Sequence, residues 1–403
     1  PVSWDEAEQM LADRIQAAGG NVRLIHGQMG PTMTRLADAF LERVGGSRTE
    51  FQALSEAPLR EAARIAFGVN QVPGYDFGAA RFVISFGSDF LETGASPVEH
   101  GRGFARMAAA DEHGAKGRLV FAGPRLSLTG LNADEWLPIR PGAEAALALG
   151  MASVIAAGSD VAGPYASLLE SYDAATAAEA AGLDEEMVHE LARTFAEGPS
   201  LAVGPGVGSH HRTATAAHLA ALVLNSVAGN VGTTLHLRNG PRSAASRPYA
   251  DMEEAIGAMA GGQVGVAMVH GANPAYELPR ASGFAEAFAS VGFKVSFASA
   301  PNETSAMADL ILPDRHFLES WGDSMPRPGT LTIQQPVMQA VPHFDAKQTG
   351  DVLLSVGSRM GSGLGVATFY EYLRNTHRET HGDAPTPFDE AWRQALRRGV
   401  VQF

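Results

Sequence analysis

Short apolar runs recur along this 403-residue chain and alternate with longer helical patterns. The runs that we interpret as strands lie at residues 22–25, 82–86, 118–122, 201–203, 264–269, 293–297 and 310–312. Helical patterns separate them, most clearly at residues 143–157, 185–196 and 213–227. Apolar strands that alternate with helices are typical of parallel sheets covered on both faces. We therefore predict an α/β fold in which any ligand lies at the carboxyl ends of the strands.

Glycine, proline and small polar residues follow several of the predicted strands. These clusters are Gly87-Ser88-Asp89, Gly123-Pro124-Arg125, Gly271-Ala272-Asn273-Pro274 and Asn302-Glu303-Thr304. Small residues at such positions let backbone N–H groups approach a phosphate. They are also typical of tight turns between a strand and a helix, which is the simpler interpretation of any one cluster taken alone.

The glycine-rich stretch Gly204-Pro205-Gly206-Val207-Gly208 does not fit a dinucleotide-binding fingerprint. Ser209 stands where that fingerprint needs its third glycine. The stretch also lies deep in the chain, whereas the fingerprint belongs to a first strand–helix unit. The sequence therefore does not indicate a simple NAD-dependent enzyme.

The composition excludes several kinds of site. The chain contains no cysteine, which excludes disulfides, thiolate catalysis, and iron–sulfur clusters or zinc held by cysteine within it. The formal net charge of -14 argues against nucleic acid and anionic membrane surfaces as partners. No apolar run reaches the roughly 20 residues that span a bilayer. The 13 histidines are scattered without ligand-like spacing, so we predict no metal site.

Several motifs follow one another in a characteristic order along residues 1–345. The longest runs from Ala133 to Leu147 and is similar to the signature A-D-x-W-L-P-I-R-P-G-T-D-A-A-L. The others are Val2-Ser3-Trp4-Asp5-Glu6-Ala7, Gly87-Ser88-Asp89, Gly123-Pro124-Arg125, Gly229-Asn230-Val231-Gly232, Gly271-Ala272-Asn273-Pro274 and Asn302-Glu303-Thr304 with Ala308-Asp309-Leu310-Ile311-Leu312-Pro313. As a set, they resemble the motifs of the molybdopterin oxidoreductases of the dimethyl sulfoxide reductase type.

The resemblance implies a particular fold. Two Rossmann-like parallel-sheet domains, one inserted in the other, would surround a bis(molybdopterin guanine dinucleotide) cofactor. Residues 1–100 and 236–345 would form the split domain, residues 101–235 the inserted domain, and residues 346–403 a Gly-rich and then helical C-terminal segment. We find no counterpart of the family's cluster-bearing first domain or of its final domain, so we expect a pterin here to be exposed and weakly held.

The resemblance also implies cofactor-binding residues at the strand ends. There, amides and arginine would hold a pyrophosphate, and carboxylates would hold guanine. The implied residues are Gly87, Ser88, Asp89, Pro124, Arg125, Arg140, Gly142, Glu144, Gly271, Asn273, Pro274, Asn302, Glu303 and Thr304.

Some positions depart from the family pattern. Gly123 replaces an aspartate, Asp89 an asparagine, and Ala143-Glu144 a Thr-Asp pair. We therefore expect weaker contacts to the nucleotide end of a cofactor. The family's metal ligand would fall near residues 51–56, where only Ser55 or Glu56 could bind a metal. A helix cap is the alternative interpretation of Ser55.

Further stretches indicate a subfamily. Residues 89–98, 126–134 and 316–323, with Gln334-Gln335-Pro336, resemble the molybdopterin-like component of alternative complex III and of related quinone-reductase complexes. The resemblance implies a subunit without molybdenum, not itself catalytic, in a membrane-associated respiratory quinol-oxidising complex. It implies as partners an iron–sulfur subunit or domain that carries the clusters, quinol-binding membrane subunits and cytochrome c subunits, on the periplasmic side of the membrane.

Two alternatives remain open. The chain could be the core of a true molybdenum bis(molybdopterin guanine dinucleotide) oxidoreductase that acts on a small oxyanion, sulfur compound or N-oxide. The retained Arg140, Asn273 and Glu303 favour this alternative. The other is an independent nucleotide-binding module.

Overall fold

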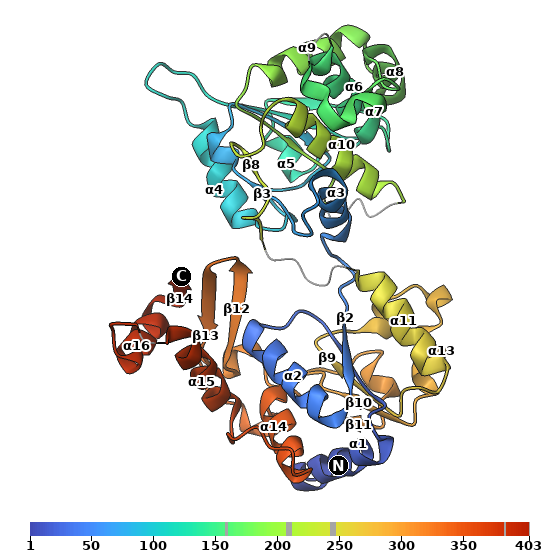
Figure 1. The fold of residues 1–403 in the computed structure, drawn as a ribbon, viewed down its shortest axis with the longest axis vertical. Helices are drawn as coiled ribbons and strands as arrows, with labels where there is room; N and C mark the ends of the chain where they lie inside the picture. The colour runs from blue at the N-terminus through green and yellow to red at the C-terminus, as the bar shows by residue number, and fades with distance from the viewer. Residues whose placement is uncertain (158–159, 207–211, 242–246, 383, 403) are drawn as a thin grey trace. The chain divides into compact units, whose positions relative to one another are not determined.

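The computed structural model describes residues 1–157, 160–206, 212–241, 247–382 and 384–402 (Figure 1). The end of the glycine-rich stretch that begins at Gly204, with His210 and His211, lies outside these residues. The chain divides into unit 1, formed by Pro1–Ala53 and Arg247–Phe403, and unit 2, formed by Leu54–Ser246. Unit 2 is thus inserted into unit 1.

The boundaries of the two units differ from those we expected. The inserted unit begins at Leu54 and not at residue 101, because the strand at residues 82–86 pairs with strands of unit 2. Residues 346–403 are not a separate segment, because Val352, Leu353 and Val356 pack into the main core of unit 1.

Unit 1 is built on a five-stranded parallel sheet with the strand order β11-β10-β9-β1-β2. Its strands are β1 (Val22–His26), β2 (Ser47–Glu50), β9 (Val266–His270), β10 (Phe293–Ser296) and β11 (Leu310–Ile311). Successive side chains of a strand point to opposite faces, so Leu24 and Met268 join one apolar cluster while Ile25 and Val269 join another. The sheet is therefore covered on both faces.

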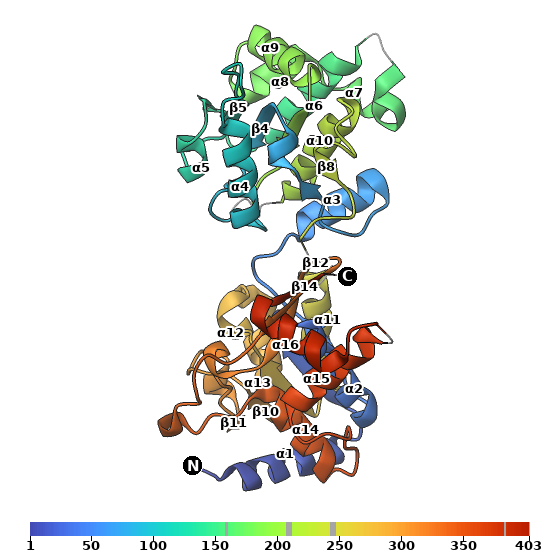
Figure 2. The same ribbon diagram turned by 90° about the vertical axis from the view of Figure 1, so that its left-hand side faces the viewer.

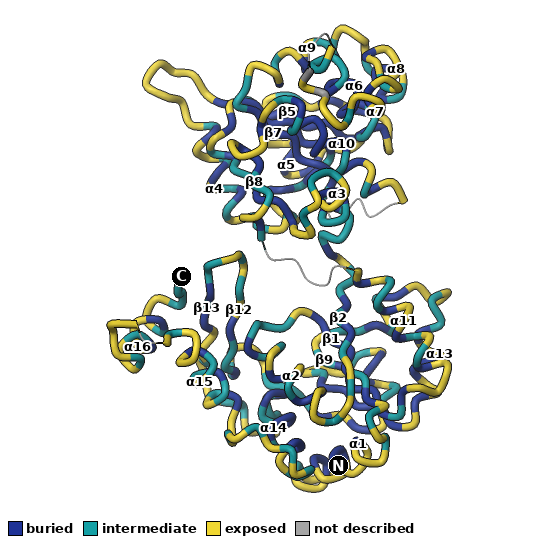
Figure 3. Tube along the Cα trace, in the orientation of Figure 1, coloured by how far each residue is buried: buried dark blue, intermediate teal, exposed yellow. Residues whose placement is uncertain are grey.

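Different helices supply the two apolar layers of unit 1. Residues of α1 (Trp4–Ala18), α2 (Pro31–Val44) and α14 (Thr349–Arg359) pack on one face. Residues of α11 (Pro248–Ala260) and α13 (Phe284–Ala289) pack on the other. Figure 3 shows the central strands β1 and β9 buried between helices whose outer sides are exposed.

The C-terminal part of unit 1 forms a smaller antiparallel layer that the sequence did not predict. The strands β12 (Gly322–Arg327), β13 (Thr330–Gln334) and β14 (Val400–Gln402) pair in that order. The helices α15 (Phe369–His381) and α16 (Phe388–Arg398) lie beside them (Figure 2). Ile333 of β13 packs there with Leu373 and Trp392.

Unit 2 contains a four-stranded parallel sheet with the order β6-β5-β4-β7. Its strands are β4 (Phe82–Phe86), β5 (Arg118–Ala122), β6 (Glu135–Leu137) and β7 (Ser200–Val203). The helices that contribute most residues to its larger apolar cluster are α6 (Glu144–Ala156), α8 (Ala174–Ala181), α9 (Glu185–Ala196) and α10 (Ala214–Val227). Met107 of α4 (Pro97–Ala108) packs in the cluster on the other face.

Shorter elements complete the two units. In unit 2, β3 (Gly74–Tyr75) pairs with β8 (Leu235–His236), and α3 (Ala57–Phe67) packs against α10. The remaining short helices are α5 (Leu128–Leu131), α7 (Ala166–Leu169) and α12 (Pro274–Glu277). Within the described ranges, no helix is both long and apolar enough to cross a membrane.

In each parallel sheet there is one point at which the order of the strands along the chain reverses. In unit 2 the chain moves from β4 to β5 and β6, and then returns to β7 on the other side of β4. In unit 1 it moves from β1 to β2, and then returns to β9 on the other side of β1. Ligands of open α/β sheets bind at the carboxyl ends of strands beside such points. A ligand site is therefore expected at these two edges.

Candidate functional site

The carboxyl edge of the unit 1 sheet carries a cleft of about 390 Å³. Loops that follow β9 and β10 line it, with His270, Asn273, Asn302 and Arg315 among the polar side chains. Its volume lies within the range of small-molecule sites, about 300–1,000 Å³. The arrangement offers a cation and amide donors to a ligand of nucleotide size.

His270 and Asp314 form a hydrogen-bonded pair in this cleft. His270 Nε2 lies 3.0 Å from Asp314 Oδ2. Asp314 Oδ1 accepts hydrogen bonds from the backbone N–H groups of Arg315 and Thr349, both at 2.9 Å. Backbone donors therefore fix the carboxylate, and the carboxylate in turn orients the imidazole. In the sequence, the pair is marked only by the positions of its members, each of which closely follows a predicted strand, at residues 264–269 and 310–312.

A second cleft of about 280 Å³ shares His270, Asp314 and Arg315 with the first. Its other walls come from the loop after β1 and from the region of Trp321. At the carboxyl edge of the sheet, the loops that follow β1 and β9 leave no opening between them, because Gly27 N–H donates to the carbonyl of His270 at 2.9 Å. A Cβ atom on Gly27 would lie only 2.0 Å from Gly271 O.

The expected cofactor-binding residues of unit 1 hydrogen-bond mainly to one another. Asn273 Nδ2 donates to Glu303 Oε2 at 2.7 Å, and Asn273 Oδ1 accepts from Thr304 Oγ1 at 2.7 Å and from Thr304 N at 3.1 Å. The Asn273 amide holds the pKa of Glu303 below its usual range. Asn302 Oδ1 accepts from Ser305 N at 2.7 Å. The structure thus brings Asn273, Glu303 and Thr304 together, and only Asn273 and Asn302 of this group line the cleft.

The remaining two expected residues of unit 1 shape its backbone. Gly271 has a left-handed φ of 61° directly after β9, a conformation that favours glycine. Pro274 begins the short helix α12, a position at which a backbone N–H would have no partner within the helix, so proline costs no hydrogen bond there. Both observations favour the turn interpretation.

In unit 2 the two arginines expected to hold phosphate are already engaged. Arg125 Nη2 lies 3.0 Å from Asp89 Oδ2, and Arg140 Nη1 donates to the carbonyl of Glu179 at 2.6 Å. Glu144 is buried in the first turn of α6. Arg140 and its neighbour Gly142 are exposed.

The remaining expected residues of unit 2 lie in turns at strand ends. Gly87 turns the chain after β4 with a left-handed φ of 78°. Ser88 N–H donates to Ser85 Oγ at 2.9 Å, which closes that turn. Pro124 is exposed just after β5. All three positions fit tight turns at strand ends.

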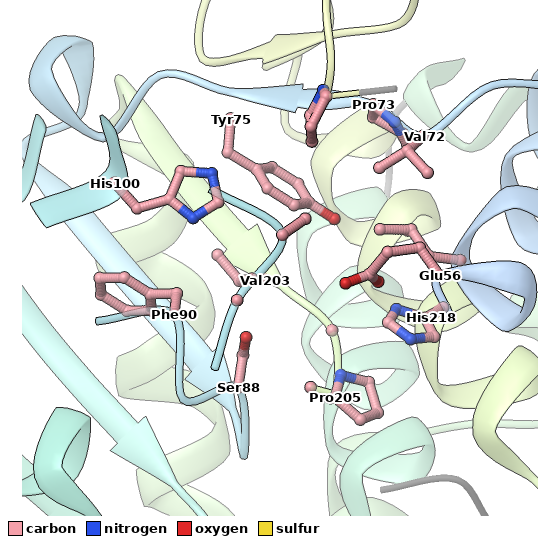
Figure 4. Close-up of a pocket in the computed structure, with 16 residues that line it drawn as sticks. Glu56, Val72, Pro73, Tyr75, Ser88, Phe90, His100, Val203, Pro205 and His218 are labelled. Carbon is pink, nitrogen blue, oxygen red and sulfur yellow. The ribbon is translucent and has the colours of Figure 1, made fainter. Parts of the chain in front are cut away.

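Unit 2 also contains a small cavity beside the carboxyl ends of β4 and β7 (Figure 4). Its volume of about 30 Å³ is enough for one or two water molecules. Its polar lining comes from Glu56, Tyr75, Ser88, His100 and His218. Ser88 and Glu56 are candidate site residues from the sequence, but nothing in the sequence indicates that Tyr75, His100 and His218 converge with them.

The pKa values of two groups in this cavity are shifted strongly. Burial raises the pKa of Glu56 to about 7. Burial, and secondarily the charge of Glu56, raises the pKa of Tyr75 above its usual range. Figure 4 shows the Glu56 carboxyl group inside the cavity, near the Tyr75 hydroxyl and the His218 ring. Burial thus favours the protonated form of the Glu56 carboxyl group.

Neither candidate metal ligand lies in a metal-binding cluster of the part of the chain that the structure describes. No group of three or more His, Asp or Glu side chains there could hold an ion. Ser55 is buried, and its Oγ accepts from Ala57 N at 3.4 Å. This contact agrees with the interpretation of Ser55 as a residue that closes the start of α3.

The two units fit a pterin nucleotide unequally. In unit 1, the cleft has the volume for a nucleotide. Arg315 lines it with its Nε donating to the carbonyl of Ala346 at 3.1 Å, and the Asn273 amide donates to Glu303, so a ligand would have to share or displace these contacts as well. In unit 2, the described cavity admits only water, and the arginines expected for phosphate already have partners. A bound pterin would supply redox chemistry at its metal. Of the described residues, those of unit 1 offer it the readier nucleotide site.

The fold and the arrangement of strand-end motifs define a class of protein. Residues 1–357 match the molybdopterin oxidoreductase family, and the chain belongs to that family.

Individual relatives agree with this assignment. The chain is 33% identical over 399 residues to the molybdopterin-binding-like subunit of menaquinone reductase from Nitratidesulfovibrio vulgaris, a match that covers 93% of this chain and 57% of that protein. It is 29% identical to the dimethyl sulfoxide reductase DmsA of Escherichia coli over 38% of this chain and 20% of that protein. The chain thus spans little more than half the length of the first of these relatives.

A solved structure shows the same fold. Acetylene hydratase from Pelobacter acetylenicus superposes with a TM-score of 0.68, at 17% identity, over 90% of this chain and 59% of that one.

Proposed function

We propose that this chain is a molybdopterin-like subunit of a respiratory, quinone-linked electron-transfer complex. The observation that carries the proposal is the 33% identity over 399 residues to a menaquinone reductase subunit described as molybdopterin-binding-like. The match to the dimethyl sulfoxide reductase covers a much smaller share of the chain, 38%. In this proposal the chain scaffolds iron–sulfur electron transfer and does not itself catalyse a reaction at molybdenum.

Unit 2 supports a role without a full pterin site. The Asp89–Arg125 ion pair neutralises the arginine that would otherwise meet a phosphate. The arginine of the longest motif, Arg140, is bound to a backbone carbonyl. A cofactor would have to displace both contacts in order to use these side chains.

The direction of electron flow that we propose is the one that the name of the relative gives. The resemblance found in the sequence favours a quinol-oxidising complex, whereas the relative belongs to a menaquinone reductase. We therefore propose quinone reduction, with electrons arriving through an iron–sulfur partner and with cytochrome c subunits upstream. Membrane subunits would hold the quinone, and the chain would lie at the periplasmic face.

The cleft of unit 1 favours a second candidate function, the core of a molybdenum oxidoreductase. It has the volume of a ligand site and includes Arg315 and Asn273. Chemistry would then be oxygen-atom or electron transfer at molybdenum, with the protein positioning the cofactor.

Elemental analysis of the purified native assembly separates the two proposals. Molybdenum, tungsten and iron are measured relative to this chain, and pterin is measured by the fluorescence of its oxidation products. We expect iron without stoichiometric molybdenum or tungsten. About one molybdenum or tungsten per chain would overturn the scaffold proposal and support the second candidate.

A further inference from the structure

The turns that follow β4 and β5 meet at the edge of the unit 2 sheet where a ligand is expected. The strand order reverses beside β4, and open α/β sheets bind ligands at the carboxyl ends of strands next to such a point. The two strands pair along their whole length, from Phe82 and Arg118 to Phe86 and Ala122. The residues that follow them therefore lie at the same edge of the sheet.

This edge offers groups that are suited to binding a phosphate. The Arg125 side chain is largely exposed, and Asp89 is the only acceptor that contacts its guanidinium in the ranges that the structure describes. The backbone N–H groups of Asp89 and Phe90 have no hydrogen-bond acceptor in the same ranges. A guanidinium and unpaired N–H groups beside a strand end form a common arrangement for an oxyanion.

The carboxylate of Asp89 already occupies this arginine. Arg125 Nη2 lies 3.0 Å from Asp89 Oδ2. The Asp89 side chain is nearly buried, so it cannot turn away into solvent as a surface carboxylate would. A phosphate at Arg125 would therefore meet a like charge at close range, which is strongly unfavourable.

The backbone around Asp89 holds this carboxylate in place. Ser88 N–H donates to Ser85 Oγ at 2.9 Å, and Ser85 Oγ donates to the carbonyl of Ser88 at 2.9 Å. Glu92 N–H donates to the carbonyl of Asp89 at 3.0 Å. The exposed Glu92 adds a second negative charge to the same turn.

We propose that Asp89 keeps phosphorylated ligands out of unit 2, because its carboxylate fills the place of a phosphate on Arg125. Unit 2 then contains an anion site that is closed by a side chain of the same chain. When open, the site would take a phosphate or pyrophosphate group. The inference rests on the proposed function, in which unit 2 holds no complete cofactor, and it names the residue that enforces this exclusion.

The test is calorimetric titration of the full chain with inorganic pyrophosphate. Asp89→Asn removes the charge and keeps the size of the side chain. We expect this variant to gain a pyrophosphate site with an affinity at least about tenfold above that of the parent chain, because a like charge beside the guanidinium is removed. The gain should be lost when Arg125→Ala is added. Pyrophosphate bound in the unit 1 cleft is common to all variants and cancels in the comparison.

Glu135→Gln is the matched control. Glu135 pairs with Arg118 at the amino end of β5, so the substitution removes the same charge and frees an arginine at the opposite edge of the sheet. This variant should gain no pyrophosphate site. Asp89→Glu keeps the charge and should remain closed like the parent chain.

A second neutral variant, Asp89→Ser, replaces Asp89→Asn if the latter does not fold, which thermal melting determines. The proposal is overturned if a folded neutral variant binds pyrophosphate no more tightly than the parent chain, or if its gain survives the loss of Arg125. It is also overturned if Glu135→Gln gains an equal site, or if the parent chain itself binds pyrophosphate and loses this binding in Arg125→Ala. The proposed function is tested separately, by the metal content of the native assembly.

Discussion

Arg125 Nη2 lies 3.0 Å from Asp89 Oδ2, so an ion pair joins the turns that follow β4 and β5. The Asp89 side chain is only 12% exposed, whereas that of Arg125 is 74% exposed. Asp89 Oδ1 has no hydrogen-bond partner among the described residues. The arginine is therefore the main compensation for a nearly buried carboxylate.

Replacing this arginine should destabilise unit 2 modestly. Arg125→Ala removes the partner of Asp89, and because one member of the pair is exposed we expect a loss of about 1 kcal/mol in the free energy of unfolding. Chemical denaturation of the variant and the parent measures the difference. The exposed Arg102 provides a control, since Arg102→Ala should change stability by less. Equal stabilities of both variants would show that the ion pair contributes nothing.

Replacing Asn273 should destabilise unit 1 more than replacing Arg125 destabilises unit 2. Asn273→Ala leaves both the hydroxyl and the N–H of buried Thr304 without their acceptor. An unsatisfied buried donor costs about 1–3 kcal/mol, so we expect a loss in that range. Thermal and chemical denaturation provide the measurement. Glu303→Gln keeps an acceptor for Asn273 Nδ2 and should be nearly neutral; a loss of similar size there would contradict the assignment.

His26 should make stability depend on pH in a defined window. Its Nδ1 lies 2.6 Å from Gly27 O and its Nε2 faces Arg48 Nη1 at 3.2 Å, so the neutral ring is satisfied on both sides. Burial, opposed by the hydrogen bond to Gly27 and reinforced by the charge of Arg48, lowers the pKa of His26 from 6.5 to about 4. Between these two pH values the unfolded chain binds more protons than the folded chain. The contribution of His26 to stability is therefore present above pH 6.5 and is lost as the pH falls towards 4.

His26→Gln should remove this dependence. One proton corresponds to a slope of at most about 1.4 kcal/mol per pH unit. The free energies of unfolding of parent and variant are measured at several pH values across the window. Plotted against pH, the slope for the variant should be shallower than that for the parent by up to this amount. The exposed His113 offers a control, because His113→Gln should leave the curve unchanged. Parallel curves for parent and His26→Gln would refute the prediction.

Much of the fold could be predicted from the pattern of apolar residues. The runs at residues 82–86 and 118–122 are β4 and β5 with the same bounds, and the helix expected at 185–196 is α9. The two strands lie in the middle of the parallel sheet of unit 2, where a continuous apolar run is required. Within the antiparallel layer, the addition of β14 to β13 could not be predicted, because the pairing of residues 330–332 with 400–402 depends on contacts distant in sequence.

The candidate site was predictable only in part. The strand-end turns at Gly87 and Gly271 were visible because glycine is needed for their left-handed backbone. The partners of the polar residues were not visible, since Asp89 meets Arg125 and His270 meets Asp314 only once strand order is known. The same holds for the cavity, where Glu56 and His218 are brought together by packing of α3 on α10.

Two glycine substitutions test how tightly the edge of the unit 1 sheet is closed. Gly27→Ala would place a Cβ atom 2.0 Å from Gly271 O, a backbone atom that cannot move without separating β1 from β9. We expect a loss of about 1–3 kcal/mol or more, as for other overpacked positions. Gly257→Ala is the matched control, because it lies in α11 with no atom within 4 Å of the new Cβ. There the substitution should stabilise the protein by about 0.5–1 kcal/mol, since alanine favours a helix. Denaturation curves of both variants in the same buffer give the change in the free energy of unfolding. A loss for Gly27→Ala with a gain for Gly257→Ala supports direct backbone contact at this edge. No change for Gly27→Ala would show that the two loops can separate and that the clefts on either side can merge.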